Sequence, residues 1–226
     1  MRKIFRSILR FLRWTVGLFF GSTVLAVVLL KFVPVYYTPL MIIRLFQNEE
    51  MKLEHKWVPL TEISRQMPLA VMGSEDAHFR EHYGFDIDAI GKAVKRNREH
   101  PEKNQLGAST ISQQTAKNVF LWPGRSWVRK GLEAYFTVLI ELFWGKERIM
   151  EVYLNSIEMG VGIYGVEAVA REHFGCSARE LTAEQCALIA ATLPNPLRFS
   201  SKHPSEYIKK RQRQILREMK YLEKHE

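Results

Sequence analysis

A long uncharged apolar run near the amino terminus is the strongest pattern in the chain. Residues 14–30 carry no charged side chain and follow a basic segment that contains Arg2, Lys3, Arg6, Arg10 and Arg13. As a helix, this run would span about 26 Å, and residues 31–35 extend it towards the ~30 Å thickness of the hydrocarbon core of a bilayer. The pattern predicts a single transmembrane helix over residues 14–35.

The flanking charges predict the orientation of this helix. Basic residues gather before the apolar run and are few just after it. This distribution places a basic tail, residues 1–13, in the cytoplasm and the rest of the chain across the membrane. A cleaved signal peptide is the main alternative, but residues 31–34 offer no small-x-small cleavage site.

From residue 68 onward, apolar residues recur mostly with the period of an α-helix. The pattern predicts helices over residues 69–80, 87–98, 110–118, 127–143, 146–157, 165–174, 182–193 and 204–223. The spacings of Ser177 with Glu180 and of Thr182 with Gln185 match capping boxes, which mark helix starts. Alternating apolar and polar residues are nearly absent, so we expect a mainly α domain over residues 68–226, with a basic C-terminal helix and no large sheet.

Residues 36–67 have mixed character and are expected to form a connector next to the membrane. Pro34 and Pro39 are expected to end the membrane helix, and residues 41–46 are expected to form a short helix. Residues 98–107 are polar, contain Pro101 and Gly107, and are expected to form a mobile loop.

Composition and charge exclude several classes of protein. Of the 226 residues, 46% are apolar, which suffices for one packed domain and excludes a disordered chain. The net charge of +9 lies at the two ends, because residues 49–197 hold 17 basic and 20 acidic side chains. The body therefore lacks the basic face of a nucleic-acid reader. Two cysteines, Cys176 and Cys186, exclude a disulfide scaffold and leave their own pairing open.

Residues 75–86 crowd seven acidic, basic or histidine side chains together, which is costly unless the segment is exposed or catalytic. His78 and His82, with Glu81 between them, also match the H-x-x-E-H pattern of a zinc site. That reading requires a third ligand, for which Glu133, Glu141 and Glu147 are available. The alternative is a solvated helix end that turns at Gly84.

Residues 107–118 combine a helix start with groups suited to an anion. Thr110 and Gln113 have capping-box spacing, whereas Gln114, Lys117 and Asn118 fall on one face of the helix. Hydroxyl groups and a lysine at a helix start are typical of a phosphate-binding site, to which Arg125 could add a second cation.

A third cluster, Arg129, Lys130 and Glu133, opens an otherwise apolar helix. A surface ion pair along the helix is the simplest interpretation of its spacing. The aromatic residues Phe120, Trp122 and Trp127, which lie between the second and third clusters, suit either an edge that dips into the membrane or ordinary core packing.

Taken together, five ordered blocks resemble the signature motifs of the peptidoglycan glycosyltransferases, which polymerise lipid II into glycan strands. The first block contains Glu75, Asp76, Phe79, His82, Gly84 and Asp86. The second is residues 107–118, and the third is Arg129, Lys130 and Glu133. The fourth runs through residues 146–175, including Tyr153 and Asn155, and the fifth covers residues 184–196. We expect no transpeptidase domain, as in the monofunctional biosynthetic transglycosylases.

The resemblance implies a lysozyme-like helical fold and a role for each block. Glu75 is implied as the base that activates the 4-hydroxyl of incoming lipid II, and Glu133 as a donor-side carboxylate that orients cations. The pyrophosphate of the growing chain is implied to bind Ser109, Thr110, Gln113, Gln114, Lys117, Asn118, Arg125, Arg129 and Lys130. No cofactor is required, although Mg²⁺ or Mn²⁺ is allowed at the pyrophosphate near Glu133.

Two alternatives accompany this interpretation. A lysozyme-type glycan hydrolase would share the fold and a catalytic Glu, but it needs neither an anchor nor a cationic cradle. A silent cell-wall scaffold would need neither Glu75 nor Glu133. Some relatives carry Lys where this chain has Leu132, so Arg125 and Lys130 would carry more of the phosphate binding here.

The resemblance also implies where the protein acts and with what. We expect it in the bacterial inner membrane, with its catalytic domain in the periplasm. Its expected partners are lipid II, the lipid-linked growing chain and proteins of cell-wall synthesis or division. Nucleic acid is not expected.

Overall fold

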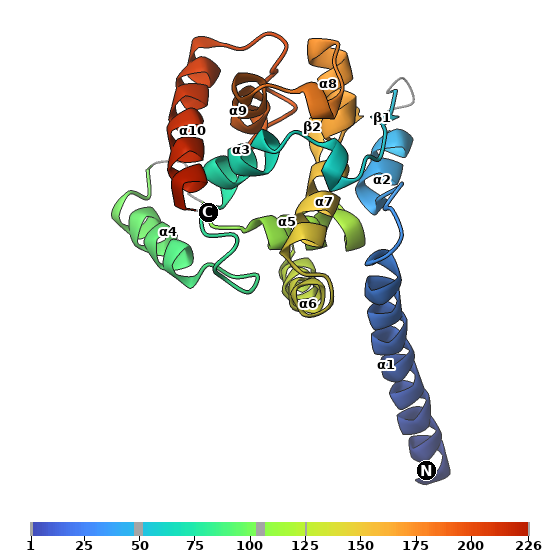
Figure 1. The fold of residues 1–226 in the computed structure, drawn as a ribbon. Coiled ribbons are helices and arrows are strands. Elements are labelled where there is room, and N and C mark those ends of the chain that lie inside the picture. Colours follow the sequence, from blue (N-terminus) through green and yellow to red (C-terminus); the bar gives the residue numbers. More distant parts are fainter. Residues whose placement is uncertain (1, 48–51, 103–106, 125, 226) are drawn as a thin grey trace.

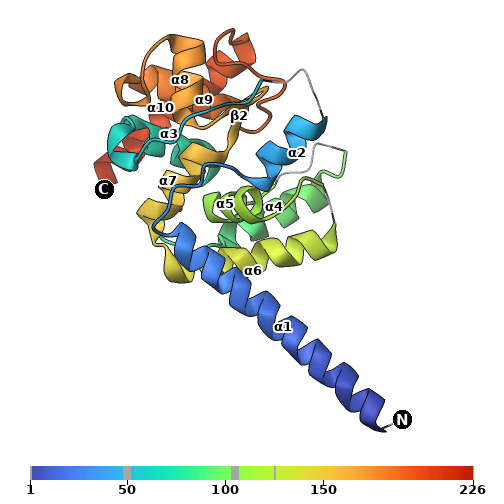
Figure 2. The same cartoon turned by 90° about the vertical axis from the view of Figure 1, so that its right-hand side faces the viewer.

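A computed structural model describes residues 2–47, 52–102, 107–124 and 126–225. The amino-terminal helix α1 (Arg2–Leu30) projects away from a helical domain (Figures 1 and 2). Its apolar side chains are largely exposed, among them Trp14 at 75% and Leu18 at 73%. Because water disfavours such a surface, and the helix is long and apolar enough to cross a membrane, the predicted anchor is supported.

The helix differs from the prediction at both ends. It begins at Arg2, inside the basic tail, and ends at Leu30, ahead of Pro34. Pro34 lies beyond the end of the helix, and the bounds of the membrane-spanning part, residues 14–35, remain a prediction. Pro39 does not interrupt a helix. It is the first residue of α2 (Pro39–Gln47), a position where its fixed φ and missing N–H carry no penalty.

The carboxyl-terminal part of α1 is bonded to the domain. The hydroxyl groups of Thr23 and Tyr135 lie 2.8 Å apart, and Trp144 Nε1 donates to the carbonyl of Val27 over 2.7 Å. Arg148 Nη2 donates to the carbonyl of Leu30 over 2.7 Å. These bonds fix the domain against the end of the helix.

The remaining helices confirm the mainly α prediction. Those after α2 are α3 (Gln66–Glu75), α4 (Ile87–Glu99), α5 (Ile111–Phe120), α6 (Trp127–Phe143), α7 (Lys146–Ser156), α8 (Val166–Phe174), α9 (Ala183–Thr192) and α10 (Glu206–His225). Short 3₁₀ turns, η1 (Leu60–Glu62) and η2 (Ala178–Glu180), join some of them. Except for α3, each of these helices lies within two residues of its predicted ends. The arrangement is consistent with the lysozyme-like fold that the resemblance implied.

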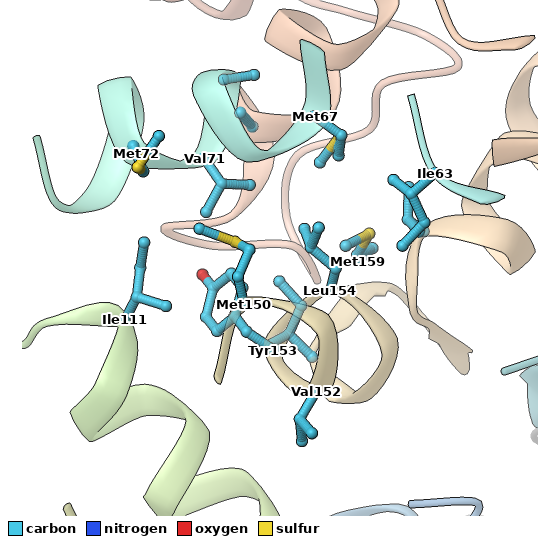
Figure 3. Close-up of a cluster of buried hydrophobic side chains, with 14 of the residues drawn as sticks. Ile63, Met67, Val71, Met72, Ile111, Met150, Val152, Tyr153, Leu154 and Met159 are labelled. Atoms are coloured by element: carbon cyan, nitrogen blue, oxygen red, sulfur yellow. The ribbon is translucent and has the colours of Figure 1, made fainter. Parts of the chain in front are cut away.

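Helix α7 lies at the centre of the domain. Its residues Met150, Tyr153 and Leu154 are buried between α3 and α5 (Figure 3). From α3, Met67, Val71 and Met72 face this cluster, and Ile111 faces it from the start of α5 (Figure 3). Helices α9 and α10 cover the other side of α3. This packing brings the end of α3 and the start of α5, which carry the first two motifs, to the same core.

The predicted connector contains a strand as well as α2. Strand β1 (Glu54–His55) pairs parallel with β3 (Ile163–Tyr164), and β2 (Glu158–Gly160) pairs antiparallel with β3. The buried Asn155 secures the neighbouring segment, because its side chain accepts from Val58 N and donates to Val58 O, both over 2.9 Å. The motif residue Asn155 therefore has a structural role.

Two glycines provide a matched test of this packing. Gly165 and Gly145 both have φ of +81°, but a Cβ on Gly165 would lie 2.7 Å from the carbonyl oxygen of Asn155, whereas one on Gly145 would meet nothing within 4 Å. Alanine at Gly145 should cost about 1–3 kcal/mol of backbone strain. Alanine at Gly165 should cost about 1–3 kcal/mol more because of the clash.

The measurement is urea unfolding of both full-length variants in detergent, followed by circular dichroism. Equal losses of unfolding free energy in the two variants would contradict this account of Gly165.

Candidate active site

Glu75 is the last residue of α3 and stands between two cavities. It lines a cavity of about 340 Å³ together with Ser109 and Lys92. One of its carboxylate oxygens accepts a hydrogen bond from Gln114 Nε2 over 3.0 Å, and Gln114 lines a second cavity of about 400 Å³. A half-buried carboxylate at this junction can take a proton from a group in one cavity while a reaction partner occupies the other.

Gln114 is oriented by the buried Tyr153, whose hydroxyl group donates to Gln114 Oε1 over 3.4 Å. The amide NH₂ group of Gln114 therefore faces Glu75. Burial raises the pKa of Tyr153 well above its usual value, and the negative charges of Glu75 and Asp76 raise it further. Tyr153 thus remains a neutral donor, which keeps the amide NH₂ group of Gln114 directed at Glu75.

The predicted helix over residues 69–80 was wrong at its carboxyl end. Helix α3 stops at Glu75, and Asp76 adopts an extended φ of −164°. The buried carboxylate of Asp76 accepts from His82 Nε2 over 2.9 Å and from the backbone N–H of Ile111 over 2.9 Å. The start of α5, 35 residues away, therefore determines where α3 ends.

The contacts of His82 and His78 also disagree with the zinc-site interpretation of this segment. His82 is held by Asp76 through Nε2, and its Nδ1 accepts from the Gly84 N–H over 3.1 Å, so both ring nitrogens are engaged within the protein. His78 is instead paired with the exposed Glu81. Within the described residues, no group of three His, Cys, Asp or Glu side chains is placed to hold a metal ion.

The other residues of the first motif also support the loop. The hydroxyl group of Thr110 donates to Gly84 O over 2.7 Å, and Asp86 caps α4 by accepting from the Ala89 N–H over 2.8 Å. Phe79 is buried in the core. These residues fix the position of Glu75 by holding the segment that follows it.

The second motif divides between the two cavities. Ser109 lines the cavity of Glu75, whereas Gln114, Lys117 and Asn118 line the 400 Å³ cavity, so the predicted shared face is confirmed. Thr110 and Gln113 form the predicted capping box. Their side chains are therefore engaged within the protein, and their binding of a ligand remains a prediction.

The third motif places cations beside the larger cavity. The buried Glu133 accepts from Arg129 Nη1 over 3.1 Å and from Lys130 Nζ. Arg129 lines the 400 Å³ cavity with Lys117, but Lys130 lines a separate cavity of about 300 Å³. Two of the predicted cationic ligands, Lys117 and Arg129, are thus brought together with Gln114 and Asn118, whereas Lys130 lines another cavity. Arg125 lies outside the described residues.

The surroundings of Lys117 change its pKa. Burial lowers its pKa, and the positive charges of Arg129 and Lys130 lower it too, against the opposing effect of Glu133 and Glu75. A negatively charged ligand in the cavity would oppose both effects, because a nearby negative charge favours the protonated form of Lys117.

Arg44 and Glu158 were missed as site residues from the sequence, although both line the larger cavity. Arg44 Nη2 lies 3.8 Å from a carboxylate oxygen of Glu158. Arg44 could have been found, because it is the one charged residue in the apolar run of residues 39–46. No local signal marks Glu158.

A carboxylate base beside a cavity lined with cations is typical of an enzyme that transfers a sugar from a phosphorylated donor. The chain belongs to the transglycosylase family, whose model matches residues 43–220. This result confirms the resemblance inferred from the motifs.

Similar proteins agree with this assignment. A biosynthetic peptidoglycan transglycosylase of Bacteroides thetaiotaomicron is 58% identical over 223 residues, which cover 97% of this chain and 89% of that protein. Proteins of the same description from Bdellovibrio bacteriovorus and Pseudomonas fluorescens are 56% and 47% identical. These alignments cover 96% and 98% of this chain, and 87% and 92% of the respective relatives.

The bonds of Asp76 predict a large loss of stability when its charge is removed. Asp76→Asn should lower the free energy of unfolding by about 1–3 kcal/mol, because an amide matches the two donors poorly in a buried position. Glu81→Gln, which breaks the exposed pair with His78, should cost no more than about 1 kcal/mol. Urea unfolding of both variants checks the difference, and equal losses would contradict the role of Asp76.

The lowered pKa of Lys117 predicts that anion binding weakens at alkaline pH. A bound anion raises this pKa, so affinity is full below the pKa of the free protein and falls as the pH rises through it. Lys117→Arg stays charged and should lose less affinity. The measurement is a calorimetric titration of the wild type and of Lys117→Arg with inorganic pyrophosphate between pH 7 and pH 10. Because the protonation of pyrophosphate affects both proteins equally, the difference between their pH profiles reports on residue 117. Identical pH profiles would rule out Lys117 as the titrating group.

Proposed function

We propose that this chain is a peptidoglycan glycosyltransferase that polymerises lipid II into β-1,4-linked glycan strands and releases undecaprenyl pyrophosphate. The observation that carries the proposal is the position of Glu75 between one cavity that contains Lys117 and Arg129 and another that does not. The names of the similar proteins, biosynthetic peptidoglycan transglycosylases, agree with it.

The smaller cavity would receive the acceptor. Glu75 takes the proton from the 4-hydroxyl of the acceptor sugar, because a hydroxyl group is a weak nucleophile at neutral pH. The hydroxyl oxygen attacks the anomeric carbon of the donor from the side opposite the leaving group, which inverts that carbon. The bond between this carbon and the pyrophosphate oxygen breaks, and its electron pair leaves with the pyrophosphate.

The larger cavity would hold the pyrophosphate of the growing chain. Lys117 and Arg129 stabilise the negative charge that increases as the glycosidic bond breaks. Glu133 positions Arg129 and Lys130 by accepting their hydrogen bonds. It acts through these cations rather than on the sugar. Direct contributions of Ser109, Asn118, Arg125 and Lys130 remain predictions.

A divalent ion near Glu133 also remains a prediction. Both carboxylate oxygens of Glu133 already accept from cationic side chains, and the described residues offer no cluster of three metal-binding side chains. The residues here do not fit an ion held by the protein alone. The protein's own cations suffice for the step proposed above.

A hydrolase would use the same carboxylate but has no need for the cations. Lys117 and Arg129 at the pocket, together with the exposed apolar helix α1, favour a transferase that acts on a lipid-linked sugar. The presence of both Glu75 and Glu133 disfavours a silent scaffold.

The membrane side of the domain follows from α1. We infer a cytoplasmic amino terminus and a periplasmic domain in the inner membrane, since Arg and Lys precede the apolar run. Trp122 and Trp127 are 46% and 91% exposed and suit a membrane interface, whereas Phe120 stacks on Phe136 in the core. Proteins of cell-wall synthesis or division remain predicted partners.

Replacement of Glu75 tests the function directly. Glu75→Gln keeps the size of the side chain and removes the base, so polymerisation of labelled lipid II should fall by about 10²–10⁴-fold. Glu81→Gln, an exposed glutamate six residues away, is the matched control and should polymerise at the wild-type rate. Gel analysis of the products of the detergent-solubilised proteins gives the measurement.

Each other outcome has a definite meaning. Full activity of Glu75→Gln would remove Glu75 from the mechanism. Shortening of preformed glycan by the wild type, without polymerisation, would indicate a hydrolase. Neither activity, over a range of detergents, would indicate the scaffold.

A further inference from the structure

Arg44 brings a further cation to the cavity that holds Lys117 and Arg129. It lies on α2, the helix that follows the membrane anchor, and it lines the 400 Å³ cavity. Leu40, four residues earlier on the same face, lines the cavity too. Helix α2, which packs against α5 (Figure 2), therefore forms one wall of the cavity.

The guanidinium group of Arg44 has donors left over. Its Nη2 lies 3.8 Å from Glu158, which is longer than a hydrogen bond of about 2.7–3.2 Å. Its buried Nε has no hydrogen-bond partner within the described part of the chain, and the same holds for the Nε of Arg129, Arg148 and Arg211. Of these four arginines, Arg44 and Arg129 line the 400 Å³ cavity. A guanidinium group carries five N–H donors, so two arginines on one cavity suit a ligand with several acceptor oxygens.

The charge of the cavity points to the same kind of ligand. Glu133 already offsets much of the charge of Arg129, and Glu158 lies beside Arg44. A lipid-linked pyrophosphate carries about two negative charges and gains more as its glycosidic bond breaks. If Arg44 moves away from Glu158, its positive charge can stabilise the additional negative charge on the pyrophosphate.

The position of α2 suits a ligand with a lipid tail. On the helix surface away from the cavity, Ile42, Leu45 and Phe46 are 45%, 38% and 84% exposed. An apolar surface of this kind on a short helix next to a membrane anchor is typical of a helix that lies in the membrane interface. In that position, α2 would hold Arg44 at the level of the lipid head groups.

We propose that Arg44 binds the donor pyrophosphate directly, and that Glu158 holds its guanidinium group at the cavity wall when the donor is absent. The inference rests on the proposed function, since it names a further ligand of the same substrate. The donor pyrophosphate would then be bound by Arg44 of α2, the helix next to the membrane, as well as by Lys117 of α5 and Arg129 of α6.

Glu158 is suited to release Arg44. Burial raises the pKa of its carboxyl group, against the opposing effects of Arg44, the Tyr164 hydroxyl and the Gly162 N–H. When Arg44 turns towards the pyrophosphate, the carboxyl group can take up a proton, and it keeps the hydrogen bond from Tyr164, which is 3.3 Å long. The release therefore leaves no unpaired charge in the wall.

The experiment measures binding of undecaprenyl pyrophosphate to the full-length protein in detergent by calorimetry. Arg44→Ala should weaken binding about tenfold, and Arg44→Lys should weaken it less. Glu158→Gln should tighten binding, because it frees Arg44 and removes a negative charge. Arg217→Ala, on the exposed surface of α10, is the matched control and should bind as the wild type does. Undecaprenyl monophosphate should show a smaller effect of Arg44.

Arg44→Ala is expected to weaken binding and Glu158→Gln to tighten it. These opposite changes in affinity distinguish an Arg44 that binds the pyrophosphate from an Arg44 that only pairs with Glu158 to hold α2 in place. Equal weakening by both would show that the pair only secures α2, and wild-type affinity of Arg44→Ala would also overturn the inference. If Arg44→Ala lowers the melting temperature, Arg44→Gln repeats the test with a longer side chain.

The two proposals fail in different ways. A wild type that polymerises lipid II, with Arg44→Ala equal to it in binding, would overturn the role of Arg44 alone. A wild type that neither binds undecaprenyl pyrophosphate nor polymerises lipid II would overturn the proposed function and the role of Arg44 with it.

Discussion

The buried carboxylate of Asp76 is the interaction on which the site depends. It accepts hydrogen bonds from His82 and from the first N–H of α5, and so joins the end of α3 to the start of α5. Glu75 precedes Asp76, and Gln114 lies one turn into α5. The contact between Glu75 and Gln114 therefore follows from the bonds of Asp76. A buried carboxylate thus determines where Glu75, the proposed base, lies.

A second buried carboxylate organises the cations. Glu133 lies inside the domain and accepts from two side chains of its own helix, which directs Arg129 towards the larger cavity. Burial of a charge is costly without such partners. The two carboxylates divide the tasks: Asp76 positions Glu75, and Glu133 positions Arg129. From the central helix α7, Tyr153 orients the amide of Gln114, which lies between Glu75 and the larger cavity.

Much of this architecture could be predicted from the sequence, and the rest could not for a physical reason. The bounds of α6 match the prediction, because its apolar period is continuous and Ser126 supplies a cap. The end of α3 was missed, because Asp76 finds its partner 35 residues away. The strands have two or three residues each, too few to show a period. Among the site residues, Lys130 lines a different cavity from Lys117 and Arg129, because spacing along a helix gives the face but not the cavity that the face meets.

The central claim is that the donor pyrophosphate occupies the cavity of Lys117 and Arg129, with its anomeric carbon towards Glu75. The most direct test is an experimental structure of the Glu75→Gln variant bound to a lipid-linked disaccharide pyrophosphate. The account predicts pyrophosphate oxygens within hydrogen-bond distance of Lys117 and Arg129, and the sugar at the junction with the smaller cavity. A pyrophosphate bound in the smaller cavity, or a sugar that lies away from residue 75, would contradict it.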